Sequence, residues 1–337
     1  MIRRYTAALF AGAIFIAPVT PAAAQGTVRS FSETDKAQGS QAHPQLMAEF
    51  GGAYKGPQAA FVERVGKRVA VQSGLSNAQG DFTVTLLDSP VENAFAIPGG
   101  YVYVTRQLLA LMNSEAELAS VLGHEVGHVA ARHAAGRQRT STIGAVLAGV
   151  VGTAAGNSTL GRLAGGGART AAQLVTLKYG RDQEYQADAL GVRYIAAANY
   201  NPYAAADMLF SLDQSSGIAA QSSGTARTLP GWASTHPNGP DRVARAEQLA
   251  KATAKTRPAA TQDTAFLRML DGLPYGDGKQ GKQMVRVVTV GPRDTVATLS
   301  ARMAVPDLKQ ERFEVLNGLT EDTPVRPGML VKLVVAR

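Results

Sequence analysis

The stretch ELASVLGHEVGHVAARHAAG, residues 117–136, constrains the fold of this chain more than any other. In it, His124 and His128 stand four residues apart with Glu125 between them. Residues four apart share one face of an α-helix, where two imidazoles can converge on a single metal ion. The 337-residue chain has only five histidines, and three of them fall in this stretch. The sequence therefore predicts a helix with a metal-binding pair rather than two satisfied core histidines.

The residues around this helix support its assignment. Ser114 stands three residues before Glu117, the capping-box spacing in which two side chains satisfy the first backbone N–H groups. We expect the helix to continue through His133 to a stop at Gly136. Before it, DFTVTLLDS alternates like a strand, and NAFAIPGGYVYVT predicts two strand pieces around a Pro-Gly-Gly turn. A hairpin or sheet edge is therefore expected ahead of the helix.

A catalytic metal site on this helix needs a third protein ligand and a base. Glu125 is rotated off the histidine pair, where it can reach a metal-bound water as a general base. His133 comes one residue early for the third histidine of the metzincin pattern. In YGRDQEYQADALG, Glu184 and Asp188 stand four apart, so one can bind metal while the other orients a ligating histidine. Spacing alone leaves Glu184 open to two readings, a ligand or an ordinary solvated acid.

Four motifs, in order, resemble peptidase family M48, which includes the membrane protease HtpX, the CAAX prenyl proteases and the periplasmic protease BepA. The motifs are VENAFAIPGGYVYVT, HEVGHVAARH, EYQAD and THPNGPDR. The resemblance runs from about residue 91 to residue 250. It implies that His124, His128 and Glu184 bind one zinc ion per chain and that Glu125 is the base.

The same resemblance implies roles for three further residues. Asp188 would orient a ligand, His236 would help to stabilise the tetrahedral intermediate, and Arg242 would support the site. Without the resemblance, His236 reads as a loop histidine that follows a turn.

The strand segment ahead of the helix is the expected binding place for substrate. An extended polypeptide would add a strand along Asn93, Ala94, Phe95, Ala96 and Ile97. Binding by strand addition depends mainly on backbone hydrogen bonds, so it has little sequence specificity. It requires an unfolded or loop segment of the substrate. The alternative is that these residues form only an ordinary hairpin.

The expected fold class is α+β, with a mainly helical, gluzincin-type metallopeptidase domain that has a small β-sheet, and a small βααβ module after it. The expected domains are a signal peptide (1–24), the metallopeptidase (25–255), a linker (256–283) and the terminal module (284–337). That module resembles a LysM domain, which implies binding to N-acetylglucosamine glycans and contact with peptidoglycan. Its Pro292-Arg293-Asp294 departs from the usual Pro-Gly-Asp. The alternative is therefore a module that has the LysM fold but does not bind glycans.

The first residues predict export. Arg3 and Arg4 precede a short apolar run, and Ala22 and Ala24 suit signal peptidase, so cleavage is expected after about Ala24. The chain has no cysteine and therefore no disulfide framework, which suits a bacterial periplasm. We expect periplasmic location, with association to the outer membrane or cell wall.

The distribution of charged and apolar residues argues against nucleic acid as a partner and against a transmembrane span. The formal charge of +8 falls to 8 − 2 = +6 without Arg3 and Arg4, and its scattered residues make nucleic acid an unsuitable partner. The glycine- and alanine-rich stretch 141–174 is expected to form packed helices or a mobile hairpin, with membrane contact as the second reading. No transmembrane span is expected after signal cleavage, which places the resemblance in the soluble, periplasmic branch of the family.

The sequence thus predicts a zinc-dependent endopeptidase that acts on unfolded or misassembled envelope proteins in quality control. The alternative is a latent or non-proteolytic, chaperone-like envelope protein, anchored to peptidoglycan by its terminal module. In the latent case, a Ser/Gly-rich loop expected at 213–233 would cover the metal site.

Overall fold

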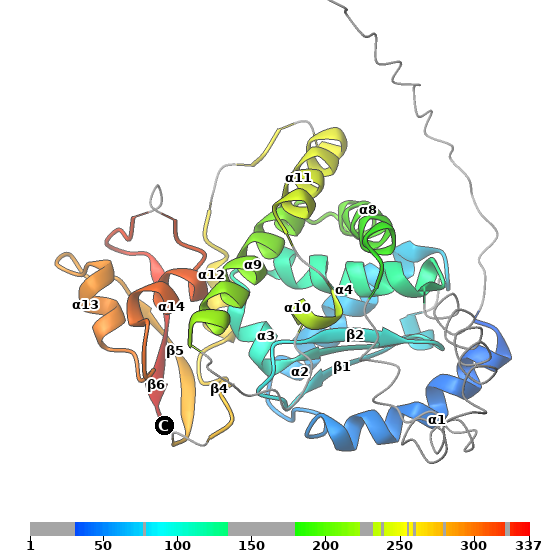
Figure 1. Ribbon diagram of the computed structural model, residues 1–337, viewed down its shortest axis with the longest axis horizontal. Coiled ribbons are helices and arrows are strands. Elements are labelled where there is room, and N and C mark those ends of the chain that lie inside the picture. Colours follow the sequence, from blue (N-terminus) through cyan, green and yellow to red (C-terminus); the bar gives the residue numbers. More distant parts are fainter. Residues whose placement is uncertain are drawn as a thin grey trace, which may run out of the picture.

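The structure is a computed structural model. It describes residues 31–76, 79–133, 179–222, 232–236, 239–254, 256–258, 261–278, 281–320 and 324–337 (Figure 1). The signal peptide expected at 1–24 and the glycine- and alanine-rich stretch 141–174 lie outside these residues. The fold is α+β, as predicted, with helices around two small sheets.

A three-stranded sheet lies in the larger part of the molecule. β1 (Thr83–Leu87) pairs in parallel with β3 (Tyr101–Thr105), and β2 (Ala94–Ile97) pairs with the other side of β3 in the antiparallel direction. Gly99 and Gly100 both have φ of 87°, a conformation that favours glycine in the turn between β2 and β3. The order β1-β3-β2 makes β2 an edge strand, as expected for the hairpin.

Helices cover both faces of this sheet, because its side chains alternate between two apolar clusters. α2 (Gln58–Ala70) and α4 (Glu115–Ala130) pack on the face that includes Val84, Ala94 and Val104. α1 (Glu33–Glu49) packs on the opposite face, against residues that include Phe95 and Tyr103. α4, which contains the predicted histidine pair, therefore lies directly against the sheet.

The helices that follow complete the larger part. They are α3 (Arg106–Leu111), α8 (Arg181–Ala197), α9 (Ala204–Ser222), α10 (Trp232–Thr235) and α11 (Pro240–Ala254), with short 3₁₀ turns at Val71–Ser73 and Gln79–Asp81. α8 crosses α4, and α9 packs against both α4 and α11 (Figure 1). Of the helices that the structure describes, none has the length and apolar character needed to cross a bilayer.

Two of the expected boundaries are wrong. α4 ends at Ala130 and not at Gly136, because Arg132 adopts a left-handed conformation with φ of 55°. The loop expected at 213–233 is helical up to Ser222. Leu212 and Ile218 are buried there, so tertiary packing overrides the weak helix propensity of the serines and glycine around them.

The terminal part has the strand–helix–helix–strand order expected for 284–337. Its elements are β5 (Gln283–Thr289), α13 (Val296–Ala301), α14 (Lys309–Leu316) and β6 (Leu330–Ala336). The expected linker 256–283 contains α12 (Thr264–Met269) and β4 (Pro274–Tyr275), and β4 extends the second sheet to β4-β5-β6. Phe266 and Leu270 are buried in the same apolar cluster as α4, so this stretch is part of the packed fold.

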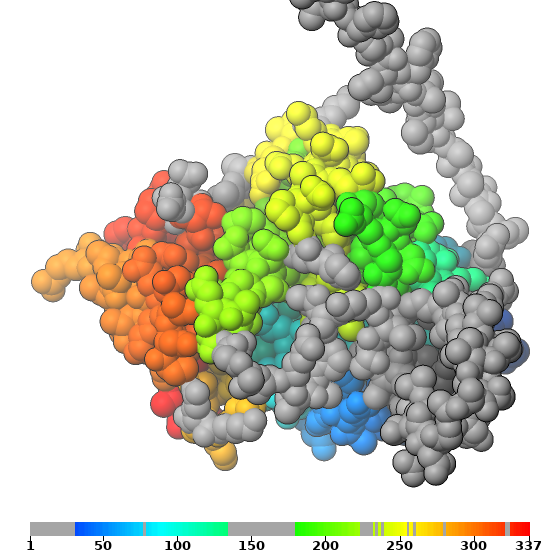
Figure 2. Space-filling view, viewed as in Figure 1, coloured from blue at the N-terminus to red at the C-terminus, as the bar shows by residue number. Residues whose placement is uncertain are grey.

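Lys332 connects the terminal part to the larger part through hydrogen bonds to its backbone. It is fully buried, and its Nζ donates to the backbone oxygens of Ala110, Leu111 and Met112 at 2.8, 3.1 and 2.6 Å. These oxygens end α3, just before α4. Burial lowers the pKa of Lys332 to about 7, an effect that the nearby carboxylate of Glu117 opposes. Figure 2 shows the terminal part, orange to red, in contact with the yellow-green surface of α9.

Candidate metal centre

α4 places both histidines of the predicted pair on one buried face. His124 and His128 are 5% and 2% exposed, and their Nε2 atoms lie 2.9 Å apart. The helix begins with Ser114, whose hydroxyl accepts the N–H of Glu117. The Glu117 carboxylate accepts the N–H of Asn113 rather than that of Ser114, so the expected capping box is shifted by one residue. The start of the helix, and with it the register of the pair, is fixed locally.

α8 brings Glu184 to the two histidines. Its Oε2 lies 3.6 Å from His124 Nε2, and its Oε1 lies 3.5 Å from His128 Nε2. The helices approach closely where they have glycines: a Cβ on Gly191 would lie 3.0 Å from the backbone nitrogen of His124. Glu184 is fully buried beside the histidine pair, so it is not an ordinary solvated acid.

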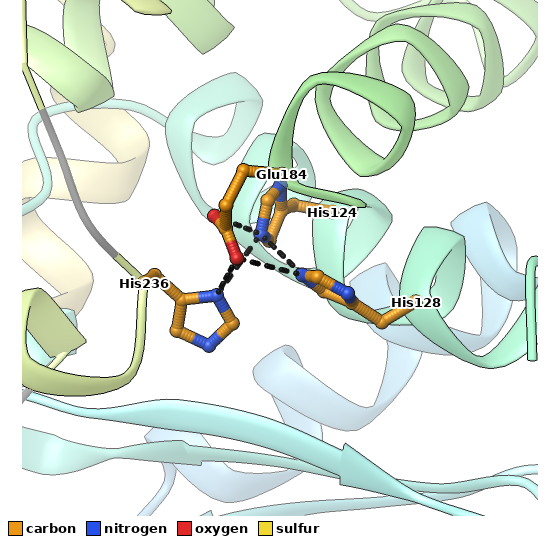
Figure 3. Close-up of side chains that lie close together, drawn as sticks. All are labelled: His124, His128, Glu184 and His236. Carbon is orange, nitrogen blue, oxygen red and sulfur yellow. Dashed lines mark hydrogen bonds and ion pairs between the residues drawn. The ribbon is translucent and has the colours of Figure 1, made fainter. Parts of the chain in front are cut away.

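His236, which directly follows α10, is the fourth member of this group. Its Nδ1 lies 3.1 Å from Glu184 Oε1 and 3.3 Å from His124 Nε2, and its Nε2 lies 3.6 Å from Glu125 Oε1. Trp232 stacks on its ring at 4.1 Å between centroids. Figure 3 shows the four side chains pointing at one another. His236 is thus placed among the donor atoms and beside the predicted base.

Asp188 and Arg242 support the group from behind. Asp188 Oδ1 lies 2.9 Å from His124 Nδ1, and Arg242 donates from Nε and Nη2 to the Asp188 carboxylate at 2.8 and 2.7 Å. Arg242 Nη1 lies 2.7 Å from Glu184 Oε2. Burial alone would raise the pKa of Asp188, but the hydrogen bonds from Arg242 and His124 hold it well below its usual range. Asp188 thus contacts one histidine of the pair, and Arg242 contacts both carboxylates.

The chemistry of these donors fits a divalent metal ion. In the part of the chain that the structure describes, His124, His128, Glu184 and His236 offer ligand atoms that all lie within 4.8 Å of one another. Burial lowers the pKa of His124, which favours the neutral ring that a metal requires. Since Asp188 accepts the Nδ1–H of His124, the lone pair on Nε2 faces the centre. Three imidazole nitrogens and one carboxylate are donors that zinc accepts.

The expected substrate strand lies along the open edge of the sheet. Thr105 N–H donates to Asn93 O, so the backbone groups of Asn93 and Phe95 face β3. By alternation, the backbone groups of Ala94 and Ala96 face the open edge. The carbonyl of Glu92, next along this edge, accepts the N–H of Trp232 at 2.8 Å. This hydrogen bond joins the segment just before β2 to α10, the helix that His236 follows.

Sequence reasoning missed three residues around the centre. Tyr179 stacks on the ring of His128 at 3.6 Å between centroids, and Trp232 contacts both His124 and His236. His133 lies 2.8 Å from His128, Nδ1 to Nδ1. Two signals were present: Trp232 is the single tryptophan and stands four residues before His236, and His133 belongs to the histidine-rich stretch.

Comparisons with known proteins agree with these motifs. The model of the family described as peptidase family M48 matches residues 57–250. The mitochondrial metalloendopeptidase OMA1 of Schizosaccharomyces pombe is 29% identical over 218 residues, which are 64% of this chain and 60% of that protein. The beta-barrel assembly-enhancing protease of Yersinia pestis is 28% identical over 221 residues, 62% of this chain and 42% of that protein. The protease of that name from Escherichia coli is 27% identical over 155 residues, 43% of this chain and 30% of that protein. The chain thus spans less than two thirds of the length of each of these relatives.

Proposed function

The chain belongs to peptidase family M48, and we propose that it is a zinc-dependent endopeptidase that hydrolyses unfolded or misassembled proteins of the bacterial envelope. The observation that carries the proposal is the buried group of His124, His128 and Glu184, with Glu125 beside it. The curated relatives named above are metalloendopeptidases or proteases by name, which supports the same activity. A periplasmic location follows from the export signal that the first residues predict.

The metal would be held by His124, His128 and Glu184. Zinc suits this set because it prefers nitrogen and oxygen donors in a catalytic site with three protein ligands, and the chain has no cysteine. A bound zinc ion would supply Lewis acidity, which polarises a substrate carbonyl and lowers the pKa of water to about 7.

The side chains around the metal position would handle protons and orientation. Glu125 would take a proton from the attacking water and return it to the leaving amine. Asp188 holds His124 in one tautomer, and Arg242 holds Asp188 and Glu184 in place. Because these contacts are buried, the groups need little reorganisation during the reaction.

The open edge of β2 would bind the substrate. The outward backbone groups of Ala94 and Ala96 can pair with an extended polypeptide, and main-chain pairing selects for unfolded segments rather than for a particular sequence. Both methyl side chains lie on the face of the sheet that α4 covers. A strand added there would run beside the helix with the catalytic residues.

One observation favours the latent form of this enzyme as the second candidate. His236 Nδ1 lies among the donor atoms, where it can act as a fourth ligand. A zinc ion with four protein ligands keeps no position for water or substrate. In that arrangement the chain would be an envelope protein with a closed metal site, and a glycan-binding role of the LysM-like module would then anchor it to peptidoglycan.

The first test is cleavage of casein, an unfolded model protein, by the mature chain with its zinc content measured. We expect cleavage by the wild type and about one zinc per chain. Glu125→Gln should retain zinc and lose cleavage by roughly 10²- to 10⁴-fold, since the amide cannot accept the proton. The matched control is Glu63→Gln on α2, where the exposed carboxylate pairs with Lys67, and it should leave cleavage unchanged. Absence of zinc after reconstitution, or full cleavage by zinc-loaded Glu125→Gln, contradicts the proposal.

A further inference from the structure

The outer nitrogen of His128 has an unusual partner. His128 turns Nε2 to the metal centre and Nδ1 away from it, and Nδ1 lies 2.8 Å from Nδ1 of His133. His133 is itself buried, and its other ring nitrogen, Nε2, lies 3.0 Å from Oε1 of Gln186 on α8. The left-handed turn at Arg132 ends α4 and returns the chain so that His133 meets His128. Three side chains from two segments are thereby joined in a line.

The direction of every hydrogen bond in this line follows from one requirement. A neutral His128 that binds metal through Nε2 must have its proton on Nδ1. For His133 to accept that proton at 2.8 Å, its Nδ1 must be unprotonated, so neutral His133 must have its proton on Nε2. The amide oxygen of Gln186 can only accept, which matches an Nε2–H donor. The three links therefore have one consistent direction, from His128 through His133 to Gln186.

The opposite direction is incompatible with metal binding. If Nδ1 of His133 donated to His128, the proton of neutral His128 would be on Nε2. It would then point at His124 Nε2, only 2.9 Å away, and occupy the lone pair that a metal needs. The tautomer of His133 thus decides whether His128 can be a ligand.

Charge explains why a neutral side chain suits this position. The corresponding partner of His124 is the carboxylate of Asp188. Together, Glu125, Glu184 and Asp188 give three negative charges, which Arg242 and a divalent metal ion balance. A second carboxylate behind His128 would leave the buried cluster with an excess negative charge, which is costly away from water. A histidine accepts the hydrogen bond without adding charge.

We propose that His133 and Gln186 are positioning residues that fix the tautomer of His128 and so direct its Nε2 lone pair to the metal. His133 has the larger effect, because it is buried and contacts the ligand directly. Gln186 is exposed on α8, so water can replace its amide as acceptor. The inference rests on the proposed function, since it needs His128 to be a metal ligand.

The test compares zinc affinities, measured by competition with a chelator, in the full chain and four variants. His133→Leu should bind zinc about 10- to 100-fold more weakly, the usual effect of removing a hydrogen-bond partner behind a ligand. His133→Asn should recover most of the affinity, because the Asn amide oxygen can take the place of Nδ1 as acceptor. Gln186→Met should lose only about threefold or less, because water replaces the acceptor.

The matched control is His43→Leu. His43 lies on α1, where its Nδ1 is 2.7 Å from the hydroxyl of Tyr103, outside the metal centre. This variant removes the same ring and should leave zinc affinity unchanged. The unfolding temperature of the metal-free protein is measured for each variant, since a purely structural role of His133 would lower it in parallel with zinc affinity and give no rescue by asparagine.

Nitrogen-15 NMR of protein labelled at its five histidines reads the tautomers directly. We expect the zinc-loaded wild type to have protons at Nδ1 of His128 and Nε2 of His133. A proton at Nδ1 of His133, or equal zinc affinity of His133→Leu and wild type, overturns the inference while the proposed function stands. A wild type that binds no zinc overturns both. If His133→Leu does not fold, His133→Asn and the NMR spectrum of the wild type still decide.

Discussion

At the scale of single residues, the two nitrogens of His236 face different groups. Nδ1 lies with Glu184 and His124, while Nε2 lies toward Glu125. A ring bound through Nδ1 closes the metal site, whereas a ring withdrawn from it can donate to the oxyanion of a reacting substrate, the role that the family resemblance implies. In the structure the ring is in the first of these positions, stacked on Trp232, whose backbone N–H donates to Glu92 O.

We expect His236→Ala to raise the basal cleavage of casein. The gain should be about tenfold if nine chains in ten rest with His236 in the metal centre. Zinc content should stay near one per chain, because His124, His128 and Glu184 remain. The measurement is the initial rate at saturating substrate, together with zinc content. A fall of about 100-fold with zinc retained would instead assign His236 to the oxyanion.

At the scale of elements, the distance between α4 and α8 determines whether the ligands meet. Glycines occupy the crossing: a Cβ on Gly127 would lie 3.0 Å from Ala187 O, and one on Gly191 would lie 3.0 Å from His124 N. In both cases the obstacle is backbone, which cannot rotate out of the way. The histidines on α4 and Glu184 on α8 can therefore come close together only because both positions are glycine.

Gly191→Ala should push the two helices apart. We expect a loss of about 1–3 kcal/mol in the free energy of unfolding of the metal-free protein, as for other overpacked sites, and weaker zinc binding. The measurements are urea denaturation and chelator competition. Gly217→Ala on α9 is the matched control: nothing lies within 4 Å of its added Cβ, and the substitution should stabilise that helix by up to about 1 kcal/mol. Equal stabilities of the two variants would show that the crossing tolerates a methyl group.

The elements themselves could largely be predicted from local pattern. Alternation predicted the strands around the Pro-Gly-Gly turn, and the spacing of the two histidines with the cap at Ser114 predicted the helix that is α4. Local pattern failed where distant packing decides. α9 continues through a serine-rich stretch because Ile218 is buried, and α4 stops early at Arg132, a residue type that seldom adopts positive φ.

At the scale of the whole molecule, the terminal part is packed and hydrogen-bonded to the metallopeptidase part. Phe266 of the expected linker lies in the core with α4, and Lys332 bonds the end of α3. Sequence could not predict these contacts, because each joins residues more than a hundred positions apart. The same limit held at the metal centre, where the choice of Glu184 and His236 came from family resemblance and not from spacing.

Lys332→Met should destabilise the whole protein by about 3–5 kcal/mol, because three buried backbone oxygens lose their hydrogen-bond donor and the buried side chain of Glu117 loses its neighbour. The measurement is the free energy of unfolding from urea denaturation. Lys309→Met is the matched control: this lysine is exposed, contacts one backbone oxygen at 3.4 Å, and should change stability by less than about 0.5 kcal/mol.

The loss in Lys332→Met should also depend on pH. Burial puts the pKa of folded Lys332 near 7, below its ordinary value of 10.5. Between these values the unfolded chain binds the extra proton, so the stability of the wild type rises with pH across that interval. The variant lacks this slope, and the difference between the two proteins should grow from pH 7 to pH 10. A difference that is constant over this range would show that Lys332 does not titrate there.

The contact of Lys332 with α3 also has a consequence for the time course of synthesis. The lysine follows Met112 by 220 residues, and ribosomes add about 5–20 residues per second, so roughly 10–45 s separate the two during translation. Throughout that interval, the three backbone oxygens just before α4 lack the Lys332 Nζ that donates to them. The contact at this corner can therefore form only after the last strand, β6, has been made.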